Sequence, residues 1–309
     1  MRNRMIAPIT LFLALCFVSA ARLPAQKLQV VTTQPDLADV VRAIGGDLVE
    51  VRSLTSGRED LHLVTIRPST LGAVRKADVF VQLGLDAEHQ WVPAMLGAVR
   101  NRKLRPGEAG FINASEDIDP IFTTPGRSRA EGADIHPRGN PHWNLDPGRM
   151  RIAAHTIRDA LIKLRPAERK ALEKNCALWE EKLDAAMKRW EKALAPCKGR
   201  TFIEEHDAWI YFAKRFGLEI AGRMEPKPGL NPTPKHLESL VETARDRKVR
   251  LIVTRPARGE LGRDLAAKCK ARSAVIDLSS HEIDEPEGYL VFMEKVVNAF
   301  ATGFGDDSK

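Results

Sequence analysis

One pattern constrains the fold of this chain more than any other. Short β-branched runs alternate with amphipathic stretches from residue 28, and the pattern starts again after residue 200. The first set reads LQVVTT, DLADVVRAIGG, LVEVRSL, PSTLGAVRKA and DVFVQLG, and the second runs from RTFIEE through VRLIVTR and SAVIDLS to GYLVFMEKVVNAFATG. Strands that alternate with helices predict a parallel sheet covered by helices on both faces. We therefore expect an α/β protein with two (β/α) lobes.

A third segment, bracketed by Pro166 and Pro196, separates the two sets. Its apolar residues recur every three or four positions, as on one face of a helix: Leu172, Cys176, Trp179, Leu183, Met187, Trp190 and Leu194. A helix of about 29 residues would be roughly 43 Å long. We expect a rigid connection between the lobes, with a surface helix packed on one lobe as the alternative. The expected domains are a signal peptide at 1–25, lobes at 26–165 and 197–309, and a linking helix at 166–196.

The first residues are typical of a secretory signal peptide. Arg2 and Arg4 precede the apolar run MIAPITLFLALCFVSAA, which ends in small residues. Cleavage after Ala21 or after Ala25 fits this pattern, and Cys16 is interpreted as part of the apolar run rather than as a lipid anchor. We expect a periplasmic protein.

Composition excludes some classes of function. The formal net charge is +7, but basic residues are mixed with acidic ones instead of forming the one-sided stripe of a nucleic-acid-binding protein. Nucleic acid is therefore not an expected partner. Cys176, Cys197 and Cys269 are too widely spaced for a zinc cluster, and their pairing is left open between core thiols and one disulfide.

Three histidines and one aspartate follow predicted strands or lie in loops, where ligands of open α/β sheets collect. His62 and His142 belong to the first half, and His206 and Asp277 to the second. We expect the four side chains to converge in a cleft between the lobes. Imidazole and carboxylate groups are usual ligands of first-row divalent metals, and four protein ligands form a closed site that carries a metal rather than catalyses with it.

Other residues have subsidiary roles in this interpretation. Asp207, Glu205 and Asp60 are the candidate acceptors for the second ring nitrogen of each histidine. His136 is a candidate for transient metal capture and His281 a rival ligand, while His89, His155 and His236 are interpreted as structural or solvated. The stretch 117–139 is expected to be a surface loop, and Asp146 the N-cap of the next helix.

Taken together, these motifs resemble the zinc- and manganese-binding solute receptors of bacterial ABC transporters. DLHLVTIRPS, NPHWNLDP, HDAWIYFAKRFGLEI and AVIDLS are similar, in order and spacing, to the four metal loops of that family. The resemblance implies His62, His142, His206 and Asp277 as ligands, a divalent cation as cargo, Zn²⁺ or alternatively Mn²⁺, and delivery to a membrane permease. The chain departs from the family pattern at Leu61, Thr65 and Thr254, and it lacks the long His-rich loop of many zinc receptors.

The expected function is thus extracytoplasmic binding of a divalent metal by a monomer, without enzymatic activity. Two other functions remain open at this point. One is a metal-dependent hydrolase that uses the same histidines with Glu205 as general base. The other is an adhesin with the same fold.

Overall fold

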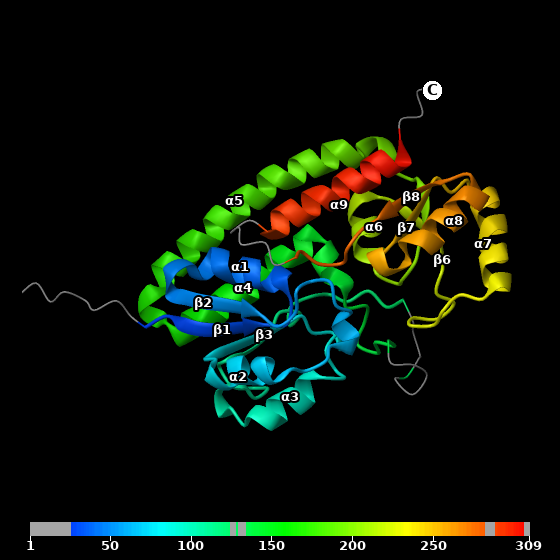
Figure 1. The fold of residues 1–309 in the computed structure, drawn as a ribbon. Helices are drawn as coiled ribbons and strands as arrows, with labels where there is room; N and C mark the ends of the chain where they lie inside the picture. The colour runs from blue at the N-terminus through cyan, green and yellow to red at the C-terminus, as the bar shows by residue number, and fades with distance from the viewer. Residues whose placement is uncertain (1–25, 124–127, 129–133, 282–287, 306–309) are drawn as a thin grey trace, which may run out of the picture.

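A computed structural model of the chain describes residues 26–123, 128, 134–281 and 288–305. The expected signal peptide at 1–25 lies outside these residues. Figure 1 shows two lobes, each built around a sheet, with helices that run along both of them. Within the described ranges, none of the helices combines the length and the apolar character of a membrane span.

The first lobe contains a four-stranded parallel sheet in the order β2-β1-β3-β4. Its strands are β1 (Leu28–Thr32), β2 (Val49–Ser53), β3 (Val79–Gln82) and β4 (Phe111–Asn113). Its helices are α1 (Pro35–Gly45), α2 (Pro68–Lys76), α3 (Val92–Val99) and α4 (Pro147–Leu164). Asp146 caps α4 by accepting a hydrogen bond from the backbone N–H of Gly148, as expected from the sequence.

The second lobe repeats this topology in a parallel sheet of the order β6-β5-β7-β8. Its strands are β5 (Thr201–Glu204), β6 (Glu219–Arg223), β7 (Leu251–Thr254) and β8 (Arg272–Val275). Its helices are α6 (Ile210–Phe216), α7 (Pro234–Asp246), α8 (Gly259–Cys269) and α9 (Gly288–Phe304). In each sheet the second strand lies on one side of the first strand and the third strand lies on the other side. Ligands of open α/β sheets bind at such switch points in the strand order.

The lobes share one hydrophobic core. Helix α5 (Arg169–Leu194) is 26 residues long and packs on α1, α4 and α9. Figure 1 shows α9 lying beside α5, and α9 also contacts α1 of the first lobe. One continuous buried cluster joins Val30 of β1, Trp190 of α5 and Phe300 of α9, whereas the outer face of each sheet has a separate smaller core. A hinge movement of one lobe relative to the other would disrupt this shared core.

The expected α/β fold with two parallel sheets and a long helix is confirmed. The buried residues of α5 match the predicted stripe except that Ala186 is buried and Met187 is only partly so. The interpretation of 117–139 as a surface loop is wrong for Asp134, Ile135 and His136, which are buried. Cys176 and Cys269 are free thiols, and Cys176 and Cys197 are buried.

Two buried carboxylates of α1 hold the lobes together on the side of β8. Asp36 Oδ1 accepts a hydrogen bond of 2.6 Å from the backbone N–H of Ser280, and Asp39 Oδ2 accepts one of 3.1 Å from the Ser280 hydroxyl. Gly57 of the first lobe also touches this turn, since a Cβ there would collide with the backbone oxygen of Ser280. Burial and the nearby charge of Asp36 raise the pKa of Asp39 from 3.8 to about 7.

The Asp39→Asn variant should lose part of the pH dependence of folding stability. The folded protein binds the Asp39 proton more tightly than the unfolded chain, so the contribution of Asp39 to stability is complete below the ordinary pKa of 3.8 and is lost as pH rises toward about 7. The fall attributable to Asp39 is roughly 2–4 kcal/mol. Urea unfolding of metal-free protein at pH 5 and pH 8 measures it. The exposed Asp47→Asn is the matched control, and equal pH dependence in both variants would contradict this account.

Candidate metal centre

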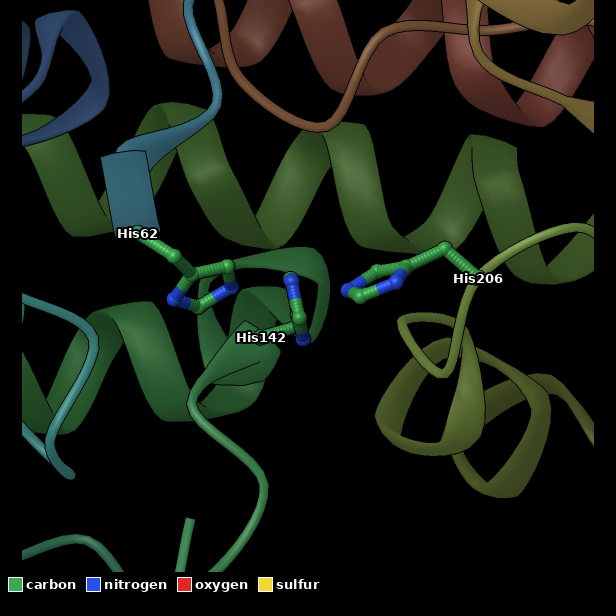
Figure 2. Close-up of side chains that lie close together, drawn as sticks. All are labelled: His62, His142 and His206. Carbon is green, nitrogen blue, oxygen red and sulfur yellow. The ribbon is translucent and has the colours of Figure 1, made fainter. Parts of the chain in front are cut away.

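Three of the four predicted ligands lie together between the lobes. His62 sits in a 3-10 turn (Leu61–Leu63) that follows β2, and His142 opens another 3-10 turn (His142–Leu145) before α4. His206 follows β5, the strand at the switch point of the second sheet. Figure 2 shows the three rings pointing toward one another from these separate segments.

The three imidazoles form a compact and buried group. Each offers one ligand atom, and these atoms all lie within 4.8 Å of one another. The ring centroids of His142 and His206 are 5.0 Å apart, and those of His62 and His142 are 5.6 Å apart. All three residues are at most 7% exposed. Such a group can bind a metal ion without rearranging the backbone.

A hydrogen-bond acceptor faces the Nδ1 atom of each ring. Nδ1 of His62 lies 3.1 Å from the carbonyl oxygen of Ala87, and Nδ1 of His142 lies 3.1 Å from Oδ1 of Asn140. Nδ1 of His206 lies 2.8 Å from Oε2 of Glu225. These acceptors favour the tautomer with a proton on Nδ1, which leaves Nε2 of each ring as the metal-binding atom.

The acceptors expected from the sequence were therefore wrong. Asp60 binds the backbone N–H of His62 rather than its ring, Asp207 pairs with Arg223, and Glu205 pairs with Arg255. Of the three observed acceptors, Glu225 is the one that the sequence could have indicated. It is an acidic residue shortly after β6, the strand that pairs with β5.

The loop that carries His142 is fixed by bonds to both lobes. Oδ1 of Asn140 also accepts the backbone N–H of His142, and Nδ2 of Asn140 donates to the carbonyl oxygen of Asp207 across the lobe boundary. The hydroxyl of Tyr211 donates to the carbonyl oxygen of Asn140, and the indole N–H of Trp143 donates to that of Leu83. The ring of His142 is thus held in place before any metal binds.

Burial and charge set different protonation states in the cluster. Burial lowers the pKa of His62 to about 4 and holds that of His142 well below 6.5, so both rings are neutral at neutral pH. Burial also acts to lower the pKa of His206, but the hydrogen bond to Glu225 and the charge of Asp134 outweigh it and raise the value to about 9. A metal that binds His206 must displace a proton from it.

Asp277, the fourth predicted ligand, lies apart from the three rings. It follows β8, and its Oδ2 atom is 3.1 Å from Nε2 of His281, with about 30% of its side chain exposed. Both residues line the same cleft as the three histidines, which has a volume of about 740 Å³. Asp277 as a metal ligand stays a prediction.

Arg255 closes one side of this cleft. Its guanidinium lies 3.0 Å from Glu205, 3.3 Å from Glu225 and 3.5 Å from Asp60. The first two acids belong to the second lobe and Asp60 to the first, so Arg255 links the lobes beside the histidines. It also balances the charge of Glu225, which accepts the His206 hydrogen bond.

His89, His155 and His236 lie in other surroundings. His155 projects from α4 and pairs with Glu180 of α5 at 2.7 Å, and His236 bonds the carbonyl oxygen of Arg223 from the first turn of α7. His89 bonds the carbonyl oxygen of Asp86 within a turn. These contacts are those of structural side chains.

The fold and the buried histidines define a two-lobed protein with a candidate metal centre between its lobes. A family model described as zinc-uptake complex component A, periplasmic, matches residues 30–303. The chain therefore belongs to this family.

Similar proteins carry zinc and manganese names. The zinc-binding lipoprotein AdcA of Streptococcus pneumoniae is 25% identical over 301 residues, which cover 94% of this chain and 58% of AdcA. The manganese ABC transporter substrate-binding lipoprotein PsaA of Streptococcus anginosus is 28% identical over 228 residues, which cover 72% of this chain and 71% of PsaA. The chain thus spans less than two-thirds of the length of AdcA.

The fold is also that of solved structures. The crystal structure of a zinc-bound deletion mutant of ZnuA superposes with a TM-score of 0.76 at 23% identity, covering 91% of this chain and 99% of the other. At that identity the likeness shows the fold alone.

Proposed function

We propose that this chain binds one divalent cation outside the cytoplasm, Zn²⁺ in preference to Mn²⁺, and delivers it to the permease of an ABC importer. The observation that carries the proposal is the set of three buried imidazoles with acceptors at Nδ1 and with ligand atoms within 4.8 Å of one another. Membership of the zinc-uptake family supports it. A cleaved leader, a periplasmic location and a monomeric state complete the proposal.

The proposed ligands are Nε2 of His62, His142 and His206 and a carboxylate oxygen of Asp277. Asp277 lines the same cleft, but its carboxylate is turned to His281. It would reach the cation by leaving His281 and turning toward the three rings. Asp277 lies shortly before Ser280, which Asp36 and Asp39 hold, so that contact would help to position the fourth ligand.

The donor set favours zinc over manganese. Three imidazole nitrogens and one carboxylate oxygen suit four-coordinate Zn²⁺, whereas Mn²⁺ prefers more oxygen ligands and a higher coordination number. Among the proposed ligands, the three imidazole nitrogens outnumber the carboxylate oxygens that Asp277 can supply, which favours Zn²⁺.

A carrier fits the surroundings better than a hydrolase. Glu205, the candidate general base, accepts hydrogen bonds from the backbone N–H and the guanidinium of Arg255. Both oxygens of this carboxylate are therefore engaged by Arg255. Four protein ligands would also leave no coordination position for an activated water. We therefore propose that the chain has no enzymatic activity.

Competitive titration with a chromophoric chelator tests this function. Purified, metal-free protein should bind one equivalent of Zn²⁺, and it should bind Mn²⁺ at least about tenfold more weakly because of the nitrogen-rich donor set. Zinc uptake by cells that carry the matching ATPase and permease should also fall when this chain is deleted. Tighter binding of Mn²⁺, or no stoichiometric binding of either ion, would defeat the proposal.

A further inference from the structure

A path of polar contacts joins two of the proposed metal ligands through one arginine. Oδ1 of Asp60 accepts a hydrogen bond of 2.9 Å from the backbone N–H of His62, and Oδ2 of Asp60 lies 3.5 Å from the guanidinium of Arg255. The same guanidinium lies 3.3 Å from Oε1 of Glu225, whose Oε2 atom is 2.8 Å from Nδ1 of His206. Arg255 thus lies in the middle of a path from a ligand of the first lobe to a ligand of the second.

Resting on the proposed function, we propose that Arg255 is a positioning residue that makes the metal centre selective for ion size. It holds the turn of His62 and the ring of His206 at one spacing before a cation binds, and this spacing favours Zn²⁺ over larger divalent ions. Arg255 acts through its carboxylate partners and not as a ligand, because a guanidinium has no lone pair to offer a metal.

An arginine suits this role because of its shape. Its planar guanidinium presents five N–H donors in a fixed fork and keeps its charge when it is partly buried. Nη1 faces Asp60 of the first lobe, whereas Nη2 faces Glu205 and Glu225 of the second lobe. The backbone N–H of Arg255 also donates to Oε2 of Glu205 at 2.7 Å. The fork therefore reaches the first lobe from a backbone that is fixed in the second.

The second-lobe end of the path is buried and firmly held. Glu205 is 2% exposed and Glu225 is 8% exposed, and charge-assisted hydrogen bonds are strong in such surroundings. Oε2 of Glu225 also accepts the backbone N–H of Gly229 at 2.9 Å. Glu225 cannot turn without breaking these bonds. The ring of His206, which Glu225 orients, is therefore held by Arg255 as well.

The first-lobe end of the path acts on the backbone. About 36% of the Asp60 side chain is exposed, so its ion pair with Arg255 contributes little to stability by itself. The Asp60 carboxylate also caps the 3-10 turn (Leu61–Leu63) that carries His62. A shift of this carboxylate therefore moves the backbone on which the His62 ring is mounted.

The length of metal–ligand bonds decides which ion a site of fixed spacing favours. Zn²⁺ binds imidazole nitrogen at about 2.0–2.1 Å, whereas Cd²⁺ is a larger ion of the same charge that forms longer bonds to the same ligands. Cavity size and flexibility are the properties by which protein sites distinguish ions of different size. Loss of a nearby charge, or a change in competition with protons, would alter the affinities for both divalent ions alike. A looser spacing would cost Zn²⁺ more than Cd²⁺, so the ratio of the two affinities reports positioning.

Competitive titration of Arg255→Gln with Zn²⁺ and with Cd²⁺ tests this role. We expect the affinity for Zn²⁺ to fall roughly tenfold and that for Cd²⁺ less than about threefold, within the range for residues that support a ligand. The preference for Zn²⁺ over Cd²⁺ should thus fall at least about threefold. Arg258→Gln is the matched control, because Arg258 lines the same cleft and its Nε atom is 3.9 Å from Glu205. It removes an equal charge outside the path and should leave the preference unchanged.

Asp60→Asn tests the path itself. An asparagine can still accept the backbone N–H of His62, but it lacks the charge that attracts Arg255. The preference for Zn²⁺ should fall in this variant too. In the Arg255→Gln background the same change should add nothing, because both substitutions break one path. Additive losses would show that Asp60 and Arg255 act independently and would overturn the proposal.

The outcomes separate this proposal from the proposed function. If wild type binds no Zn²⁺, or binds Mn²⁺ more tightly, the proposed function fails. If wild type binds Zn²⁺ as proposed but Arg255→Gln keeps the wild-type preference, or Arg258→Gln changes it equally, only the positioning role is overturned. Circular dichroism checks folding. Arg255→Lys keeps the charge but lacks the fork, and it replaces Arg255→Gln if that variant does not fold; an unchanged preference in Arg255→Lys would then overturn the role.

Discussion

His142→Ala should lower the affinity for Zn²⁺ by more than about 100-fold, since loss of a ligand should exceed the 10- to 100-fold effect of losing a ligand's hydrogen-bond partner. His142 lies centrally in the cluster, with its ring 5.0 Å from that of His206 and 5.6 Å from that of His62. Without it, two imidazoles remain, and the ion must complete its coordination with water or with a carboxylate. The loss corresponds to at least about 2.7 kcal/mol of binding free energy.

Folding should survive this change. The side chain of His142 contributes one hydrogen bond, to Asn140, whereas Asn140 keeps its bonds to Asp207 and Tyr211. Competitive titration measures the affinity and thermal unfolding of the metal-free protein measures the stability. His155→Ala, on the surface of α4, is the control and should bind Zn²⁺ like wild type. An affinity for His142→Ala within threefold of the control would rule out His142 as a ligand, because a lost ligand costs far more than about 0.65 kcal/mol.

Trp143→Ala should destabilise the fold and weaken metal binding together. Trp143 is fully buried, and its indole N–H donates to the carbonyl oxygen of Leu83 at the end of β3. Removing a buried tryptophan side chain costs about 3–5 kcal/mol of unfolding free energy. The substitution leaves a cavity beneath the 3-10 turn that also carries His142. The imidazole of His142 should therefore be held less firmly. We expect Zn²⁺ affinity to fall roughly tenfold, within the range for residues that support a ligand.

Trp190→Ala is a matched control for this prediction. Trp190 is equally large and 1% exposed, but it lies in α5 and donates its indole N–H to Glu294 of α9. The cost in unfolding free energy, measured with urea, should be similar, whereas Zn²⁺ affinity should stay within twofold of wild type, or about 0.4 kcal/mol. Equal losses of affinity in the two variants would show that general destabilisation, and not the His142 turn, governs metal binding.

Local periodicity was sufficient to predict most of the fold. The β-branched runs became β1 to β3 and β5 to β8, and the three- and four-residue spacing of apolar positions became the buried face of α5. The role of α9 was not predictable in this way. Its apolar residues show that it is buried, but not that it runs beside α5 and reaches α1.

The part of the candidate site that lies in turns near the ends of strands could be predicted from the sequence. His62, His142 and His206 come from turns that the topology brings to one place, and the structure places them together. Their Nδ1 acceptors come from distant segments, such as the carbonyl oxygen of Ala87, which no side-chain pattern reveals. The burial of Asp134 was missed because its loop has the Pro- and Gly-rich composition of exposed loops.

The most direct test of a zinc-carrying site is X-ray absorption at the zinc edge on protein loaded with one equivalent of Zn²⁺. The account predicts a four-coordinate shell of nitrogen and oxygen at about 2.0–2.2 Å, with scattering from three imidazole rings and no sulfur at about 2.3 Å. A six-coordinate oxygen shell with at most one imidazole would contradict it. So would a sulfur ligand, because it would place the ion at one of the cysteines instead of among His62, His142 and His206.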